Sequence, residues 1–131
     1  MNLSFLEYIT KFNAADMKLI DKLVRQLDEG DNLTTVMAQH FLGTMNVFRA
    51  GEALVLTQTV SVKGHSQLVV YGLIGRGIIS NAEKICDDLR TIAKTFGCSS
   101  VGGNVSRPGL ARLYQTLGAK PVYTFYELEL G

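Results

Sequence analysis

The chain has 131 residues, of which 47% are hydrophobic and 19% charged, and its formal net charge is +1. This size and composition predict one globular domain, residues 1–131, and exclude a disordered chain or a second core. The near-neutral charge argues against a dedicated nucleic-acid or membrane-surface binder, and no apolar run approaches the roughly 20 residues of a membrane span.

Two further features bear on localisation. The N-terminal segment MNLSFLEYITKF has no basic leader, no long apolar stretch and no small-residue cleavage site, so we do not expect a secretory signal. Cys86 and Cys98 are too few for a disulfide framework. We therefore expect reduced thiols in a cytoplasmic protein.

The start of the chain permits two interpretations, and a helix follows it. Residues 5–10 favour a short strand, whereas Ser4 and Glu7 have the spacing of a capping box, which would begin a helix instead. We favour the strand. Asn13 is well placed to cap a helix whose apolar positions recur at helical spacing until Gly30.

A second helix and three strands are expected next. Asp31 or Asn32 caps the helix and Gly43 ends it. The hydrophobic pattern then changes from helical spacing to alternation, which predicts strands. They cover residues 45–49, 54–62 and 67–74. The turn at Lys63-Gly64-His65 makes the second and third of them antiparallel.

The centre of the chain predicts a strand, a glycine turn and a helix. Residues 67–74 form an apolar run that suits a strand buried on both faces, and Gly75-Arg76-Gly77 breaks it. Ser80 and Glu83 have capping-box spacing for a helix that ends at Gly97. Such a junction directs open N–H groups and a positive dipole end at one spot, which favours a phosphate or another anion.

The charged positions of this central helix, among them Asp87 and Asp88, are expected to form an ordinary solvated face. A short strand over 98–104 follows it. A further helix then begins near Pro108, capped by Ser106 or Arg107, and an alternating strand over 122–130 closes the chain. The predicted order is β-α-α-β-β-β-α-β-α-β, which defines an α+β fold class.

This order and one segment resemble the GNAT superfamily of acyl-CoA-dependent N-acyltransferases. The segment Arg107–Ala119, RPGLARLYQTLGA, is similar to the family's late helix, in which an alanine-rich turn leads to a Leu-Tyr pair and a Leu-Gly-Phe ending. Ala119 takes the place of that Phe. The resemblance implies a three-layer fold with a mixed, mostly antiparallel central sheet and helices on both faces. It also implies acetyl-CoA, or a related acyl-CoA, as the cofactor.

The resemblance further implies a cofactor site. In the family, the pantetheine pairs with the end of the central strand, and the diphosphate lies on a Q/R-x-x-G-x-G/A loop. Aligning Arg76 with the first loop position places Ile79 and Asn81 where the family has small residues, and a branched Ile works against close approach of the backbone. The implied cofactor-binding residues are Leu73, Ile74, Arg76, Gly77, Ile78, Ile79, Ser80, Asn81, Asn104 and Arg107.

Two residues are candidates for catalysis. Tyr114 stands where the family has its proton donor, although its helical spacing also suits a core aromatic residue. Glu52, in a turn, is the candidate general base, although a glutamate in a turn is most often simply solvated. His40 and His65 are not assigned a role, and the histidines and cysteines lack metal-ligand spacing.

Two functions follow from these observations. The first is an acyltransferase that acts on a small-molecule or protein amine, with no nucleic-acid or membrane partner. The second is a GNAT-fold protein that has lost catalysis and serves as a binding or structural component, for example in a viral particle or a regulatory complex. The aromatic closing strand also permits a homodimer or another protein partner.

Overall fold

The computed structural model describes residues 1–27, 31–62, 64–104, 120–122 and 125–130. Its elements are β1 (Glu7–Tyr8), α1 (Ala14–Leu27), α2 (Leu33–Phe41), β2 (Asn46–Ala50), β3 (Ala53–Val62), β4 (His65–Ile74), α3 (Ala82–Thr95), β5 (Ser100–Asn104), β6 (Lys120–Val122) and β7 (Phe125–Glu129). The strands form one seven-stranded sheet in the order β1-β2-β3-β4-β5-β7-β6. The β4–β5 pair is parallel and all the other pairs are antiparallel, which confirms the mixed, mostly antiparallel sheet.

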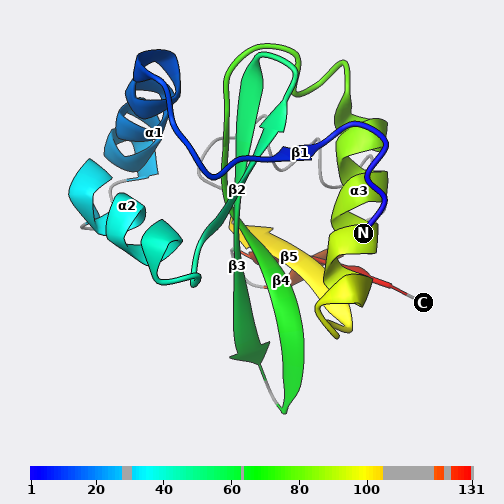
Figure 1. Ribbon diagram of the computed structural model, residues 1–131. Helices are drawn as coiled ribbons and strands as arrows, with labels where there is room; N and C mark the ends of the chain where they lie inside the picture. The colour runs from blue at the N-terminus through cyan, green and yellow to red at the C-terminus, as the bar shows by residue number, and fades with distance from the viewer. Residues whose placement is uncertain (28–30, 63, 105–119, 123–124, 131) are drawn as a thin grey trace.

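The sheet is the middle of three layers. Figure 1 shows it nearly edge-on, with α1 and α2 on one side and α3 on the other. Residues 53–57 of β3 and 67–74 of β4 are buried on both faces because helices cover both, so they lack the simple alternation of a half-exposed strand. Residues 58–61 of β3 do alternate between half-buried and exposed positions. Each face has its own core. The α1–α2 side includes Ile20, Leu23, Val36, Leu54, Leu56 and Ile74; the α3 side includes Phe48, Val55, Leu73, Ile85, Leu89 and Ile92.

The first two helices begin where the sequence predicts. The side-chain oxygen of Asn13 accepts from the N–H of Asp16 at 2.8 Å, while Asp16 Oδ2 accepts from the N–H of Asn13 at 3.0 Å. Asn32, one of the two predicted caps of α2, accepts from the N–H of Thr35 at 2.9 Å. Both caps satisfy amides that would otherwise lack a partner in the first helical turn. Gly43 has a φ of +79°, as its predicted role in ending α2 requires.

The N-terminal segment is held by a residue of α3. The carboxylate of Asp88, which is only 3% exposed, accepts from the N–H groups of Ser4, Phe5 and Leu6 at 3.0, 2.7 and 2.6 Å. It also accepts from the Ser4 hydroxyl at 3.1 Å. The prediction that Asp88 is solvated is therefore wrong. The alternative prediction of a helix that starts at Ser4 is wrong too, because these amides donate to the Asp88 carboxylate.

The strand favoured for residues 5–10 is present but shorter. Only Glu7 and Tyr8 pair with β2, opposite Arg49 and Phe48, because the preceding amides are engaged with α3. This crossing of the N-terminal segment over the sheet to α3 is visible in Figure 1. The segment thus links the two helical layers across the β2 edge of the sheet.

The later strands differ from prediction at their ends. The fifth strand begins at Ser100, because the N–H of Cys98 still donates to the carbonyl of Ala93 at 2.8 Å as α3 closes. The predicted strand over 122–130 is β7 alone, and Val122 belongs to the separate strand β6, which pairs antiparallel with β7. The predicted helix over residues 108–118 lies outside the described residues.

Candidate active site

The parallel strands β4 and β5 separate before β4 ends. Their pairing runs from Gln67 opposite Ser100 to Val70 opposite Gly103 and goes no further. The next residue of β5, Asn104, pairs with Phe125 of β7 instead. Within the described part of the chain, β4 from Gly72 onward pairs with β3 alone. The β5-facing edge of β4 therefore has backbone groups available to a ligand along its last residues.

A bulge lies where this separation begins. Leu56 of β3 is opposite Gly72 whereas Thr57 is opposite Val70, so Tyr71 is the extra residue on β4. The hydroxyl of Tyr71 donates to Asp31 Oδ2 at 2.8 Å, which ties the entry of α2 to the bulge. The sequence pattern did not predict this pair, because Asp31 has the position of a helix cap.

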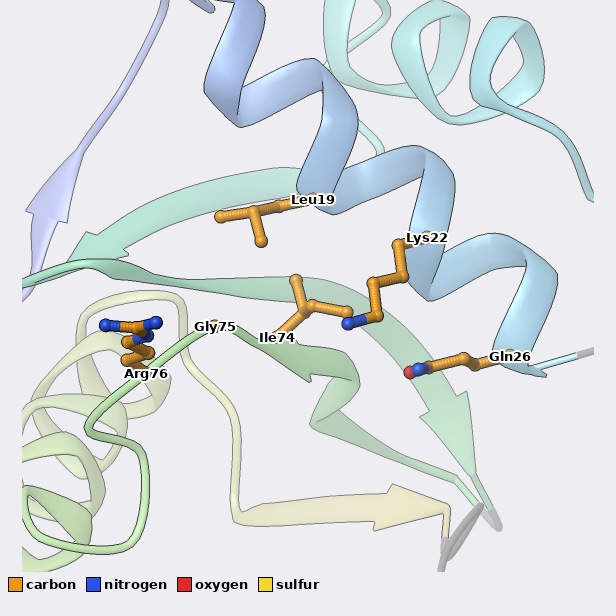
Figure 2. Close-up of a pocket in the computed structure, with 6 residues that line it drawn as sticks. All are labelled: Leu19, Lys22, Gln26, Ile74, Gly75 and Arg76. Carbon is orange, nitrogen blue, oxygen red and sulfur yellow. The ribbon is translucent and has the colours of Figure 1, made fainter.

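A pocket of about 350 Å³ opens beside the end of β4. Leu19, Lys22 and Gln26 of α1 line one side, and Ile74, Gly75 and Arg76 line the other. Figure 2 shows the Lys22 and Gln26 side chains extending from α1 toward the end of β4, with Arg76 beyond Gly75. The pocket thus has an apolar floor and a basic rim.

The charge of the pocket rim comes from two cations, Lys22 and Arg76. Among the described residues, no carboxylate lies within salt-bridge distance of Lys22 or Arg76. Of the described residues that line the pocket, none is acidic. Lys22 and Arg76, two cations from separate elements, raise the local potential, so this part of the pocket favours an anionic group.

The predicted base Glu52 lies near this pocket through its backbone. Gly75 has a φ of +116°, and a side chain there would lie 2.6 Å from Cα of Ala53 and 2.9 Å from the carbonyl oxygen of Glu52. The turn between β2 and β3 is therefore packed against Gly75, and only glycine fits. The Glu52 side chain is exposed. The structure thus places this candidate base beside the site but not in the pocket lining.

In the loop after β4, one carbonyl group accepts three hydrogen bonds. The Gly77 carbonyl accepts from the N–H of Asn81 at 3.1 Å, from its Nδ2 at 2.9 Å and from the Ser80 hydroxyl at 3.2 Å. The predicted capping box of Ser80 and Glu83 is therefore wrong: the N-cap residue is Asn81, and its side chain makes no cap hydrogen bond. Because the N–H of Asn81 donates to the Gly77 carbonyl, the implied cofactor-binding residue Asn81 does not offer an open amide.

The two isoleucines of this loop point in opposite senses. Ile78 is 8% exposed and belongs to the α3-side core, whereas Ile79 is 79% exposed. Neither isoleucine is among the residues that line the pocket beside the end of β4. The N–H groups of Ile78, Ile79 and Ser80 donate no hydrogen bond of normal geometry to another described residue. With respect to the described residues, these three amides are therefore available to an anion.

The remaining predicted residues divide into three groups. Leu73 packs on the α3 side, while Ile74 lines the pocket on the α1 side. Asn104 is the last residue of β5. Tyr114 and Arg107 lie outside the described residues. The structure thus brings together the end of β4, Arg76 and the Glu52 turn.

Several other chemistries lack a site in the described residues. No group of three or more His, Cys, Asp and Glu residues there could hold a metal ion. Cys86 and Cys98 are free and buried, and burial raises the pKa of both thiols, so they are poor nucleophiles. His40 packs edge-on against Phe12 at 4.7 Å between ring centroids, as a structural aromatic contact. No described helix has the length and apolarity to cross a membrane.

Solved structures similar to this one include proteins described as acetyltransferases. A protein described as a GNAT-family acetyltransferase from Desulfovibrio desulfuricans aligns with a TM-score of 0.70 and 10% identity, over 96% of this chain and 99% of that one. An N-acetyltransferase from Staphylococcus aureus Mu50 gives 0.62 and 15%, over 97% and 99%. The AtaT–AtaR complex bound to DNA gives 0.62 and 14%, over 95% and 93%. No protein-family model and no curated protein sequence matches the chain. The chain therefore has the GNAT fold.

Proposed function

We propose that this protein is an acyl-CoA-dependent N-acyltransferase, which transfers an acetyl or related acyl group to an amine by direct attack. The observation that carries the proposal is the separation of β4 from β5 beyond Val70, next to a basic pocket and a loop with three open amides. Similar structures contain acetyl-CoA in AtaTR, and CoA with a Gag peptide in the NatC complex. These ligands support an acyl-CoA in the corresponding cleft here.

The free edge of β4 suits the pantetheine arm. Its two amides resemble a short stretch of peptide backbone and can pair with the β4 groups between Gly72 and Ile74, as an added strand would. The diphosphate then accepts hydrogen bonds from the Arg76 guanidinium and from the amides of Ile78 to Ser80. This arrangement directs the thioester toward the bulge at Tyr71.

Transfer then requires one bond to form and one to break. The neutral amine attacks the thioester carbonyl, a C–N bond forms, and the C–S bond breaks with the electron pair leaving on sulfur. In our proposal Tyr114 gives the departing thiolate a proton, and the amine proton passes to Glu52, directly or through water. The acceptor is a small-molecule or protein amine in the cytoplasm. Nucleic acid is not proposed as a partner, although AtaT is known in complex with acetyl-methionyl-tRNAfMet.

Binding and turnover of acetyl-CoA test the proposal. At a concentration 100 times Kd, a ligand specific for the folded state adds about 2.7 kcal/mol of stability, which a thermal-denaturation assay detects readily. Release of free CoA thiol in the presence of amines then measures transfer. Tyr114→Phe should lower kcat with little change in the Kd for acetyl-CoA. Arg76→Ala should weaken binding, whereas the control Arg90→Ala, on the exposed face of α3, should not.

The alternative is a GNAT-fold protein that binds a ligand or partner without catalysis. One observation favours it: the described residues that line the pocket include no carboxylate and no imidazole. Acetyl-CoA binding without transfer to any amine would support this alternative. No stabilisation by saturating acetyl-CoA would refute the acyltransferase and leave a binding or structural role.

A further inference from the structure

Lys22 differs from the other cations of α1. Arg25 is paired with Asp21 at 3.1 Å, one turn earlier on the same helix. Lys18 is exposed and does not line the pocket. Lys22 lines the pocket, extends toward the end of β4 in Figure 2, and has no carboxylate within salt-bridge distance among the described residues. Its charge is therefore directed at the pocket and not at a neighbouring side chain.

The pocket suits an anion and not the acceptor amine. Lys22 and Arg76 belong to different elements and lie on either side of Gly75, and none of the described residues that line the pocket is acidic. An amine that arrived as an ammonium ion would be repelled there. A group with two negative charges would be held from both sides, since each cation can pair with one charge. Gln26 adds a side-chain amide that can donate a hydrogen bond to an oxygen of such an anionic group.

We propose that the pocket between α1 and the end of β4 binds the diphosphate of CoA, with Lys22 as its second cationic ligand opposite Arg76. This inference rests on the proposed function. It also accounts for the loop sequence. A branched residue at position 79, in place of a small one, works against close approach of a phosphate to the loop backbone, and a cation on α1 strengthens the diphosphate site from the pocket side.

The test compares two variants that lose the same charge from the same helix. Lys22→Gln should raise the Kd for CoA about 10-fold at low ionic strength, and the difference should shrink as salt is added. Lys18→Gln should leave the Kd unchanged. Both side chains are exposed, so both variants should keep the wild-type thermal midpoint without ligand. Acetyl-pantetheine, which lacks the diphosphate, should be used equally well by wild type and Lys22→Gln.

Each alternative outcome has a distinct meaning. If the wild-type protein does not bind CoA, the proposed function fails and this inference fails with it. If the wild type binds CoA and Lys22→Gln leaves the Kd unchanged, only this inference is overturned. If Lys22→Gln instead raises the KM for the amine acceptor with no effect on CoA, the pocket belongs to the acceptor and the inference is likewise overturned. Equal losses with CoA and acetyl-pantetheine would also exclude a role at the diphosphate.

Discussion

Replacing Asp88 should destabilise the protein far more than its place on a charged helix face suggests. The carboxylate accepts four hydrogen bonds from the N-terminal segment, and the one from the N–H of Leu6 is buried. A hydrogen bond to a charged group contributes about 1.5–3 kcal/mol, and a buried amide left without a partner costs about 1–3 kcal/mol. The amides of Ser4 and Phe5 are part-buried and regain water, so we expect a total loss of about 2–4 kcal/mol for Asp88→Ala.

Urea denaturation measures this loss against a matched control. With m of roughly 1–3 kcal/mol/M, the midpoint for Asp88→Ala should fall by about 1–3 M. Asp87→Ala removes the adjacent carboxylate, whose exposed pair with Arg90 at 2.9 Å contributes about 0.2–1 kcal/mol. Equal and small effects of the two variants would refute the claim that Asp88 holds the N-terminal segment.

The same contacts predict a pH dependence. Burial, the largest single effect, raises the pKa of Asp88, but the hydrogen bonds from Leu6, Ser4 and Phe5 together bring the pKa below its ordinary value. A lowered pKa in the folded state means that the stabilisation is complete above the unfolded-state pKa of about 3.9, and is lost as the pH falls through the folded-state pKa. The stability gap between wild type and Asp88→Asn should therefore be constant near neutral pH and narrow below about pH 4. A gap that widens on acidification would contradict this assignment.

Other substitutions test the packing and the caps. Gly72→Ala should cost about 1–3 kcal/mol by urea denaturation, because a methyl group there overlaps the buried side chain of Leu23, and Leu23→Ala should recover part of that loss in the double variant. Asn32→Ala should cost about 1 kcal/mol and Asn32→Ser much less, and equal losses would show that the cap bond is unimportant. Cys86 and Cys98 should react with a thiol reagent at pH 8 only after unfolding, because burial raises both pKa values; rapid reaction of the native protein would show that they are accessible.

The parts of the fold that the sequence predicts are those set by local chemistry. The Asn13 and Asn32 caps act within three residues, and the hydrophobic spacing of α1 and of β4 is a local signal. The role of Asp88 could not be predicted in this way. Its partners are 82 to 84 residues away in sequence, and on α3 it has the same spacing as residues that are solvated.

In the candidate site, too, the residues set by local sequence were predictable and those set by long-range packing were not. The end of β4 and Arg76 were identifiable from a strand that runs into glycines, and the structure places both at the pocket. Lys22 was not identifiable, because Lys18 and Lys22 both lie on the polar side of one helix and only the packing of α1 over β4 separates them. In the sequence, Tyr71 has the pattern of an ordinary position in a buried strand. Only the shift in register between β3 and β4 identifies it as a bulge residue.

The loop after β4 explains why a poor match to the glycine pattern does not close the site. A glycine-rich loop leaves its amides open because it has no side chains to cover them. Here the amides are not covered although the loop contains two isoleucines. Ile78 packs in the α3-side core, and Ile79 is exposed to solvent. The three bonds accepted by the Gly77 carbonyl close the turn without using the N–H groups of residues 78–80. Fixing the turn through one carbonyl and one buried side chain leaves the amides free. A branched residue at position 79 still works against close approach of a phosphate to the backbone, so a cation contributed by α1 matters to this site.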